Sequence, residues 1–177
     1  MTAEEYFKTP ESNLHIELVD GEIITYGSQS GIHHDIKMGM YLYISDYIKN
    51  QKHEYSVFTM PSDVPFDEYN VVQPDIYVTD EKIPKEAHHI TSVPPFIAEI
   101  CDPYNDDSDN YLKKLYMYAM NGVKEYWIID PSYKRVMVYR LFDESHLLNV
   151  YTFDQHIPVG IFDDRLELCI AELLKQG

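Results

Sequence analysis

Two acidic residues in apolar surroundings, followed by a lysine, are the groups of this chain best suited to chemistry. Asp75 lies in Val-Val-Gln-Pro-Asp-Ile-Tyr-Val, and Glu99 lies in Pro-Phe-Ile-Ala-Glu-Ile-Cys. β-Branched and aromatic residues flank each acid, which predicts two short buried strands. A carboxylate is costly to bury unless it is paired or binds a metal, and a divalent cation removes the repulsion between two neighbouring acids. Lys114, on a predicted helix, can place a positive charge beside that cation. This set of groups suits metal-dependent phosphodiester hydrolysis.

The two acids also have structural interpretations. Pro-Asp is a common turn or strand-entry pair, so Asp75 can be a capping residue. Glu99 can be a solvent-facing acid on an edge strand, although the apolar content of its strand favours a central position. Along residues 96–101 the strand period of two places Glu99 on the same face as Cys101. The two acids and the lysine together favour a site over three unrelated residues.

Length and composition narrow the class of protein. The 177 residues are enough for one domain with a hydrophobic core, which we expect to span residues 1–177. No apolar run is long enough for a transmembrane helix, and the acidic N-terminus lacks the pattern of a secretory signal. Cys101 and Cys169 lie in apolar stretches, so we expect reduced thiols and a cytoplasmic protein without a membrane partner. The net charge of −16 argues against tight nonspecific binding of nucleic acid over the whole surface.

The order of predicted elements is mixed α/β (α+β), which favours a curved mixed β-sheet flanked by helices, with an N-terminal β-hairpin. Thr2 and Glu5 form a capping-box pattern, and Asp20-Gly21 is a hairpin turn. In chain order we expect a helix over 2–7, a hairpin over 14–27, a helix over 28–49, strands over 55–60, 70–79 and 96–101, a helix over 111–120, a strand over 125–129, a hairpin of 135–142 and 149–153, a strand near 161 and a helix over 168–174. Loops are expected over 84–91 and 102–109.

Four segments of the chain resemble the Uma-two family of endonucleases, which belongs to the PD-(D/E)XK (restriction-endonuclease-like) superfamily. They are residues 16–22, 73–76, 98–100 and 122–131, and the last, Gly-Val-x-Glu-Tyr-Trp-Ile-x-Asp-Pro, is the most specific. The resemblance covers nearly the whole chain. It implies a restriction-endonuclease-like core in which the two acids lie on adjacent central strands.

The resemblance also implies roles for single residues. Asp75, Glu99 and the backbone carbonyl of Ile100 would bind Mg²⁺ or Mn²⁺, which prefer such oxygen ligands. The lysine that the superfamily places two residues after the Glu is Cys101 here. The family commonly carries it instead on the following helix, where Lys114 matches the pattern. Lys113 lies one residue away, and either lysine can also belong to a solvated helix face.

Two further residues match family positions. Glu17, on the first hairpin, could hold a metal-bound water, orient Lys114 or be a structural partner. His33, near the start of the long helix, could contact substrate or be a satisfied structural histidine. We therefore expect a Mg²⁺-dependent endonuclease that cleaves nucleic acid, with DNA as the favoured substrate. The many tyrosines are expected to fill the core or a homodimer interface.

Two other functions fit the same residues. A protein that kept the fold without catalysis could act as a binding or regulatory subunit, and the negative charge favours this reading. A metal-dependent hydrolase that acts on a small phosphate ester is the third possible function, after the endonuclease and the binding subunit. Intact Asp75, Glu99 and Lys114 favour the endonuclease over the silent protein.

Overall fold

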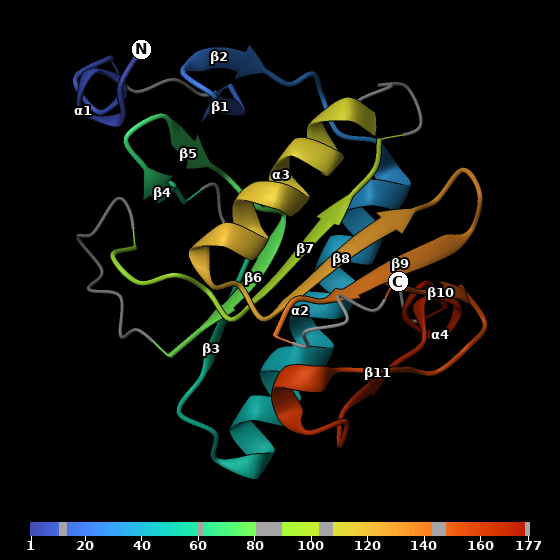
Figure 1. Cartoon of the computed structure of the whole chain (residues 1–177). Coiled ribbons are helices and arrows are strands. Elements are labelled where there is room, and N and C mark those ends of the chain that lie inside the picture. Colours follow the sequence, from blue (N-terminus) through green and yellow to red (C-terminus); the bar gives the residue numbers. More distant parts are fainter. Residues whose placement is uncertain (11–13, 60–61, 81–89, 103–107, 143–147, 176–177) are drawn as a thin grey trace.

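Helices are separated by runs of strands along the chain in the computed structural model, which describes residues 1–10, 14–59, 62–80, 90–102, 108–142 and 148–175 (Figure 1). In chain order the elements are α1 (Ala3–Tyr6), β1 (Ile16–Val19), β2 (Glu22–Thr25), α2 (Gly31–Gln51), β3 (Ser56–Phe58), β4 (Val64–Asp67), β5 (Asn70–Val72), β6 (Ile76–Thr79), β7 (Phe96–Ile100), α3 (Ser108–Asn121), β8 (Glu125–Asp130), β9 (Arg135–Arg140), β10 (Leu148–Thr152), β11 (Ile157–Pro158), the 3₁₀ helix η1 (Gly160–Phe162), β12 (Glu167–Leu168) and α4 (Ile170–Leu173).

A six-stranded sheet with the order β10-β9-β8-β7-β6-β3 is the central layer. Strands β7 and β8 are parallel and are connected through α3, whereas the other neighbours are antiparallel. All residues of β6, β7 and β8 are buried, as expected for strands covered on both faces. The predicted mixed sheet flanked by helices is therefore confirmed.

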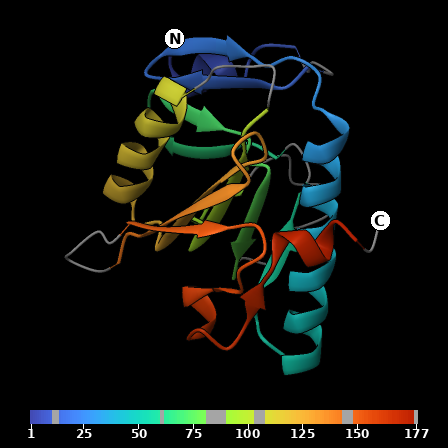
Figure 2. The same cartoon turned by 90° about the vertical axis from the view of Figure 1, so that its right-hand side faces the viewer.

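The helices cover opposite faces of this sheet, with α3 on one side and α2 on the other (Figure 2). Alternate residues of β7 serve the two layers. Phe96, Ala98 and Ile100 pack in the core beneath α2 and α4, where Ile36 and Met40 also lie. On the other face, Ile97 packs in the second core, which includes residues of α3. Glu99 shares the Ile97 face, as the strand period predicts.

Local sequence signals explain the N-terminal part. The capping box of Thr2 and Glu5 is present at α1. Asp20 and Gly21 both have positive φ (50° and 79°), which the tight turn between β1 and β2 requires. Ser30 caps α2, and its hydroxyl accepts a hydrogen bond from the backbone N–H of His33. The predicted helix, hairpin and long helix are thus confirmed, with boundaries shifted by a few residues.

Two predicted elements differ from the structure, and one strand was not predicted. The single strand over 70–79 is two strands, because Pro74 has no N–H and the chain leaves one sheet between β5 and β6. Strand β4 was missed because it contains Pro65, which is tolerated at the edge of the sheet β2-β1-β5-β4. The strand expected near Ile161 is wrong, since residues 160–162 form η1.

The loops expected over 84–91 and 102–109 lie mostly outside the described residues. None of the helices in the described ranges combines the length and the apolar character needed to cross a membrane.

Candidate active site

The pairing of β6 with β7 brings the two candidate acids together. Ile76 is paired with Ala98, so Asp75, one residue before β6, lies opposite Glu99. The backbone N–H of Asp75 donates to Glu99 Oε2 at 3.4 Å, and the N–H of Ile100 donates to Asp75 Oδ2 at 2.9 Å. Asp75 is 7% exposed and Glu99 is 3% exposed. The structure therefore places two nearly solvent-free carboxylates side by side on central strands.

The N-terminal end of α2 surrounds Asp75. His33 Nε2 lies 3.0 Å from Asp75 Oδ2, and the side-chain amide of Gln29 donates to Asp75 Oδ1 at 3.0 Å. Lys37, one helical turn after His33, donates to Gln29 Oε1 at 2.6 Å, and its Nζ lies 4.0 Å from Asp75 Oδ1. Asp75 is thus oriented by a backbone group, an imidazole and an amide, with an ammonium group close by.

Lys114 reaches the acids from α3. Its ammonium donates to Glu99 Oε1 at 2.9 Å, and it lies 2.9 Å and 2.8 Å from the two carboxylate oxygens of Glu17. One helical turn further, the hydroxyl of Tyr118 donates to the same Glu99 oxygen at 3.0 Å. Lys114 is 3% exposed, whereas Lys113 lies on the exposed face of α3. The helical phase therefore brings Lys114, and not its neighbour, to Glu99.

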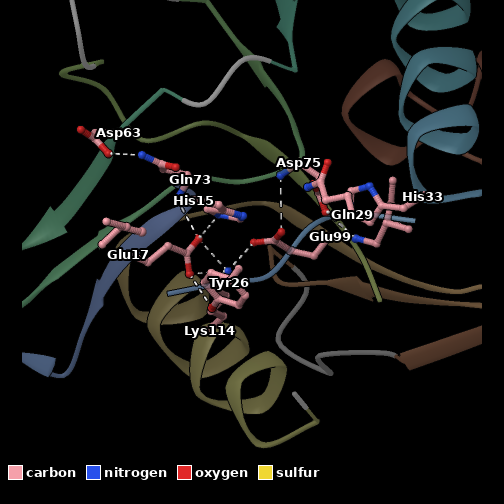
Figure 3. A network of polar contacts seen from close by, with 12 residues as sticks. His15, Glu17, Tyr26, Gln29, His33, Asp63, Gln73, Asp75, Glu99 and Lys114 are labelled. Carbon is pink, nitrogen blue, oxygen red and sulfur yellow. Dashed lines mark hydrogen bonds and ion pairs between the residues drawn. The ribbon is translucent and has the colours of Figure 1, made fainter. Parts of the chain in front are cut away.

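Glu17 is fully buried on β1, on the opposite side of the Lys114 ammonium from Glu99 (Figure 3). The Tyr26 hydroxyl donates to Glu17 Oε2 at 2.7 Å, and the backbone N–H of Gln73 donates to Oε1 at 2.8 Å. His15 Nε2 lies 3.5 Å from Oε1. Since both carboxylate oxygens of Glu17 are engaged by protein groups, this acid is placed to hold Lys114.

Comparisons with known proteins identify the family of this chain. A family model described as "Uma2: Putative restriction endonuclease" matches residues 3–167. The chain belongs to the Uma2 family. Among solved structures, this Uma2 protein is similar to one described as a putative nuclease belonging to DUF820 from Anabaena variabilis ATCC 29413. The two are 27% identical, the alignment covers 99% of this chain and 98% of that one, and the TM-score is 0.82. No match was found among curated proteins. The predicted family and the predicted fold are both confirmed.

Burial and mutual repulsion dominate the electrostatics of this Uma2 site. Burial raises the pKa of Glu99, and the nearby charges of Asp75 and Glu17 raise it further against the opposing effect of Lys114. Burial would also raise the pKa of Asp75, but hydrogen bonds from His33 and from the N–H of Ile100 lower it below its usual value. The pKa values of the two neighbouring acids therefore shift in opposite directions, and Glu99 is the acid whose negative charge is poorly compensated.

Lys114 and Glu17 form the well-compensated half of the site. Burial alone would lower the pKa of Lys114, but Glu17 and Glu99 raise it well above its usual value. Burial would raise the pKa of Glu17, yet the attraction of Lys114 lowers it to about 2. At neutral pH the lysine is an ammonium group and Glu17 is a carboxylate. Cys101, in contrast, is neutral, since burial raises the pKa of its thiol to about 12.

A small pocket opens between the two halves. It has a volume of about 40 Å³, and its lining includes Asp75, Glu99, Ile100, Asp102 and Lys114. The donors at Asp75 and Glu99 are hard carboxylate oxygens, as Mg²⁺ and Mn²⁺ prefer. No group of three His, Cys, Asp or Glu side chains at ligand spacing includes these two acids within the described residues. Such a sparse set fits Mg²⁺, which is usually held by one or two carboxylates and keeps several waters, and does not fit zinc.

Sequence reasoning found the acids, the lysine, Glu17 and His33, and the structure brings all of them to this pocket or to its wall. It missed Gln29, Lys37, Tyr26 and Tyr118, which contact the acids or their partners. The helical spacing of four residues from His33 to Lys37 and from Lys114 to Tyr118 was a usable signal. Gln29 and Tyr26 gave none, because their contacts depend on the tertiary fold alone.

Proposed function

We propose that this Uma2 protein is a Mg²⁺- or Mn²⁺-dependent endonuclease that hydrolyses phosphodiester bonds of nucleic acid, with DNA as the favoured substrate. The observation that carries the proposal is the buried pair Asp75 and Glu99 beside the Lys114 ammonium. Membership of a family described as "Putative restriction endonuclease" supports it. Asp75, Glu99 and the carbonyl of Ile100 would hold the ion. When bound, the ion would polarise the phosphate and activate a water for attack.

Each remaining residue has a role that follows from its contacts. Lys114 keeps its proton at neutral pH, so it would stabilise negative charge that develops on the phosphate and would not act as a base. Glu17, an ionised acid whose oxygens are all engaged, would orient Lys114. His33 would fix Asp75, from which its Nε2 is 3.0 Å away, and would line the entry for substrate. Of the three roles considered for Glu17, these contacts support the one in which it orients Lys114.

Metal binding is the first test. Calorimetric titration of Mg²⁺ and Mn²⁺ into the wild-type protein should give binding that Glu99→Gln abolishes. The matched control is Glu22→Gln, because Glu22 is an exposed acid on β2. Glu99→Gln should raise the melting temperature of the metal-free protein or leave it unchanged, since it removes a poorly compensated charge. If Glu99→Gln unfolds the protein, Glu99 is a structural ion-pair partner and the metal site is wrong.

Cleavage of single- and double-stranded DNA and RNA is the second test, and it separates the endonuclease from its rivals. Metal-free binding of nucleic acid should be weaker than about 10 μM at physiological salt, given the net charge of −16. Ca²⁺ should tighten binding without supporting cleavage. Tight metal-free binding without cleavage would favour a silent binding or regulatory subunit. Hydrolysis of a small phosphate ester alone would favour the third reading.

We further propose that the protein acts as a cytoplasmic homodimer. Both cysteines are free, which is typical of a reducing compartment. Three large apolar side chains on the outer face of α3, Leu112, Tyr116 and Met120, are each more than half exposed at a spacing of four residues. Light scattering of the wild type and of Tyr116→Glu tests the dimer. A wild-type monomer, or a dimer that Tyr116→Glu leaves intact, would contradict an interface through this face.

A further inference from the structure

A second cluster of metal-ligating side chains lies in the C-terminal part of the chain, outside the candidate active site. One ring nitrogen of His156, the Sγ atom of Cys169 and a carboxylate oxygen of Glu172 all lie within 4.8 Å of one another. We call these three residues the His156 cluster. Among the residues that the structure describes, it is the group of His, Cys, Asp and Glu side chains found at ligand spacing.

The local fold explains why the three side chains meet. Ile157 is paired with Leu168 between β11 and β12, so the next residues along the two strands, His156 and Cys169, face each other across the ladder. Cys169 is also the N-cap residue of α4, and its carbonyl accepts hydrogen bonds from the backbone N–H of Glu172 at 3.0 Å. Glu172 lies three residues further on, so its side chain returns over the helix start.

The distance between the two exposed ligands suits a small ion with tetrahedral coordination. Zinc–ligand bonds of about 2.0–2.3 Å place neighbouring ligand atoms roughly 3.3–3.8 Å apart. His156 Nε2 lies 3.7 Å from Glu172 Oε1. On the other side of the ring, His156 Nδ1 lies 4.0 Å from Glu167 Oε2. A carboxylate behind the second ring nitrogen is the usual arrangement for a metal-bound histidine, because it fixes the tautomer and the ring orientation.

The donor types decide which ion fits. A thiol, an imidazole and a carboxylate select zinc or a similar borderline cation, and do not suit the hard cations Mg²⁺ and Ca²⁺. Cys169 is 6% exposed, and its Sγ donates to the carbonyl of Phe153 at 3.4 Å, so the sulfur is held in place below two exposed ligands. With the thiol proton released to solvent, one thiolate and one carboxylate balance the charge of a divalent cation.

We propose that His156, Cys169 and Glu172 bind Zn²⁺ or a similar cation, with Glu167 orienting the imidazole and water completing the coordination. The ion ties the segment between β10 and β11 to the start of α4. This site is independent of the acids Asp75 and Glu99, and it gives the protein a second metal of a different chemical class. It would stabilise the C-terminal part of the fold and takes no part in phosphodiester cleavage.

Cobalt spectroscopy on the full chain tests the site directly. Co²⁺ is titrated into the wild-type protein in the presence of excess Mg²⁺, which occupies oxygen-ligand sites. Co²⁺ bound through Cys169 gives a thiolate-to-cobalt charge-transfer band in the near ultraviolet, and carboxylates alone do not give one. One equivalent of Zn²⁺ should abolish the band. Zn²⁺ should also raise the melting temperature, because it binds the folded state, and a chelator should reverse the shift.

Variants of the exposed residues identify the imidazole and its partner, and cysteine variants identify the thiolate. His156→Ala changes an exposed residue and should weaken Co²⁺ binding by more than about 100-fold. Loss of a residue that only hydrogen-bonds a metal ligand typically weakens metal binding by roughly 10- to 100-fold. Glu167→Gln should weaken it by about 10-fold. The matched controls are His34→Ala and Glu54→Gln, which change exposed residues elsewhere. Cys101→Ala should keep the band and Cys169→Ala should remove it.

Three results would overturn the proposal: absence of the band at one equivalent of Co²⁺, a band that survives His156→Ala, or a band that depends on Cys101. Loss of cleavage activity is no part of this test, so its outcome is separate from that of the proposed endonuclease.

Discussion

Replacing Lys114 by methionine removes the single ammonium group that two buried carboxylates share. Methionine keeps much of the aliphatic stem and leaves Glu17 and Glu99, which are 0% and 3% exposed, without their counterion. Removing one partner of a buried ion pair typically costs about 3–5 kcal/mol. Stability is on the order of 5–15 kcal/mol for a native domain, so this loss is a large fraction of the total. At about 2–4 °C per kcal/mol for a chain of this size, the melting temperature should fall by about 6–20 °C.

The assay is thermal unfolding of the metal-free protein by circular dichroism and calorimetry. Lys113→Met is the matched control, because Lys113 is the adjacent residue on the exposed face of the same helix, and it should change stability by less than about 0.5 kcal/mol. Without Lys114 the pKa values of the two acids rise in the folded state. The destabilisation should therefore be larger at pH 8 than at pH 5, where protonation relieves the stranded charges.

A double variant and an activity measurement complete the test. Adding Glu17→Gln to Lys114→Met should recover part of the lost stability, since it removes one of the stranded charges. Below the melting temperature of the variant, cleavage should fall by about 10²–10³, as for loss of one charge-stabilising donor, while metal affinity stays nearly intact. Cys101→Lys added to Lys114→Ala should restore part of the rate. A Lys114→Met protein that melts like wild type, or a damaging Lys113→Met, would refute the reasoning.

Three further changes probe single contacts. Glu17→Gln should destabilise the protein at pH 7 by on the order of 3 kcal/mol, because Lys114 lowers the pKa of Glu17 from 4.5 to about 2. This stability is lost as the pH falls from 4.5 towards 2. The urea midpoints of the variant and the wild type should therefore converge at low pH. Burial raises the pKa of Glu125 from 4.5 to about 7, and this carboxyl accepts a hydrogen bond from the indole of Trp127. Trp127 fluorescence should therefore titrate near pH 7, and the stability of the protein should decline as the pH rises through that value. A flat titration, or one that Glu125→Gln leaves unchanged, would contradict this expectation. Tyr118→Phe removes a hydrogen-bond donor to the Glu99 carboxylate and should raise the pKa below which the cleavage rate falls in a pH–rate profile. The cleavage rate at pH 8 should change little.

Local sequence patterns predicted the elements that carry the site. The period of two along β7 predicted that Glu99 lies on the face of the sheet that points away from α2. The helical phase around Tyr118 predicted that Lys114 points inwards. Asp20-Gly21 fixed the hairpin that carries Glu17, since a two-residue turn with positive φ sets the strand register. These features depend on neighbours within about four residues, which is the range over which sequence patterns are informative.

What could not be predicted depends on contacts between distant segments. Pro74 divides the expected strand because β5 joins the hairpin sheet while β6 joins the central sheet, and no local signal specifies that choice. Gln29 contacts Asp75 over 46 residues of sequence. Pro65 argued against a strand, yet an edge strand tolerates it, and only the assembled sheet shows which strands are edges.

The charges of the site explain how so acidic a protein can act on a polyanion. Four carboxylates, those of Glu17, Asp75, Glu99 and Asp102, face two ammonium groups, Lys114 and Lys37, which leaves two net negative charges around the pocket. A divalent cation between Asp75 and Glu99 would cancel this net charge. Without metal, both the site and the surface repel phosphate, whereas with metal the pocket is neutral overall and the cation itself attracts the phosphate. Binding of nucleic acid should therefore depend on the cation more steeply than binding through a preformed basic groove, and this dependence would restrict the chemistry to the metal-loaded protein.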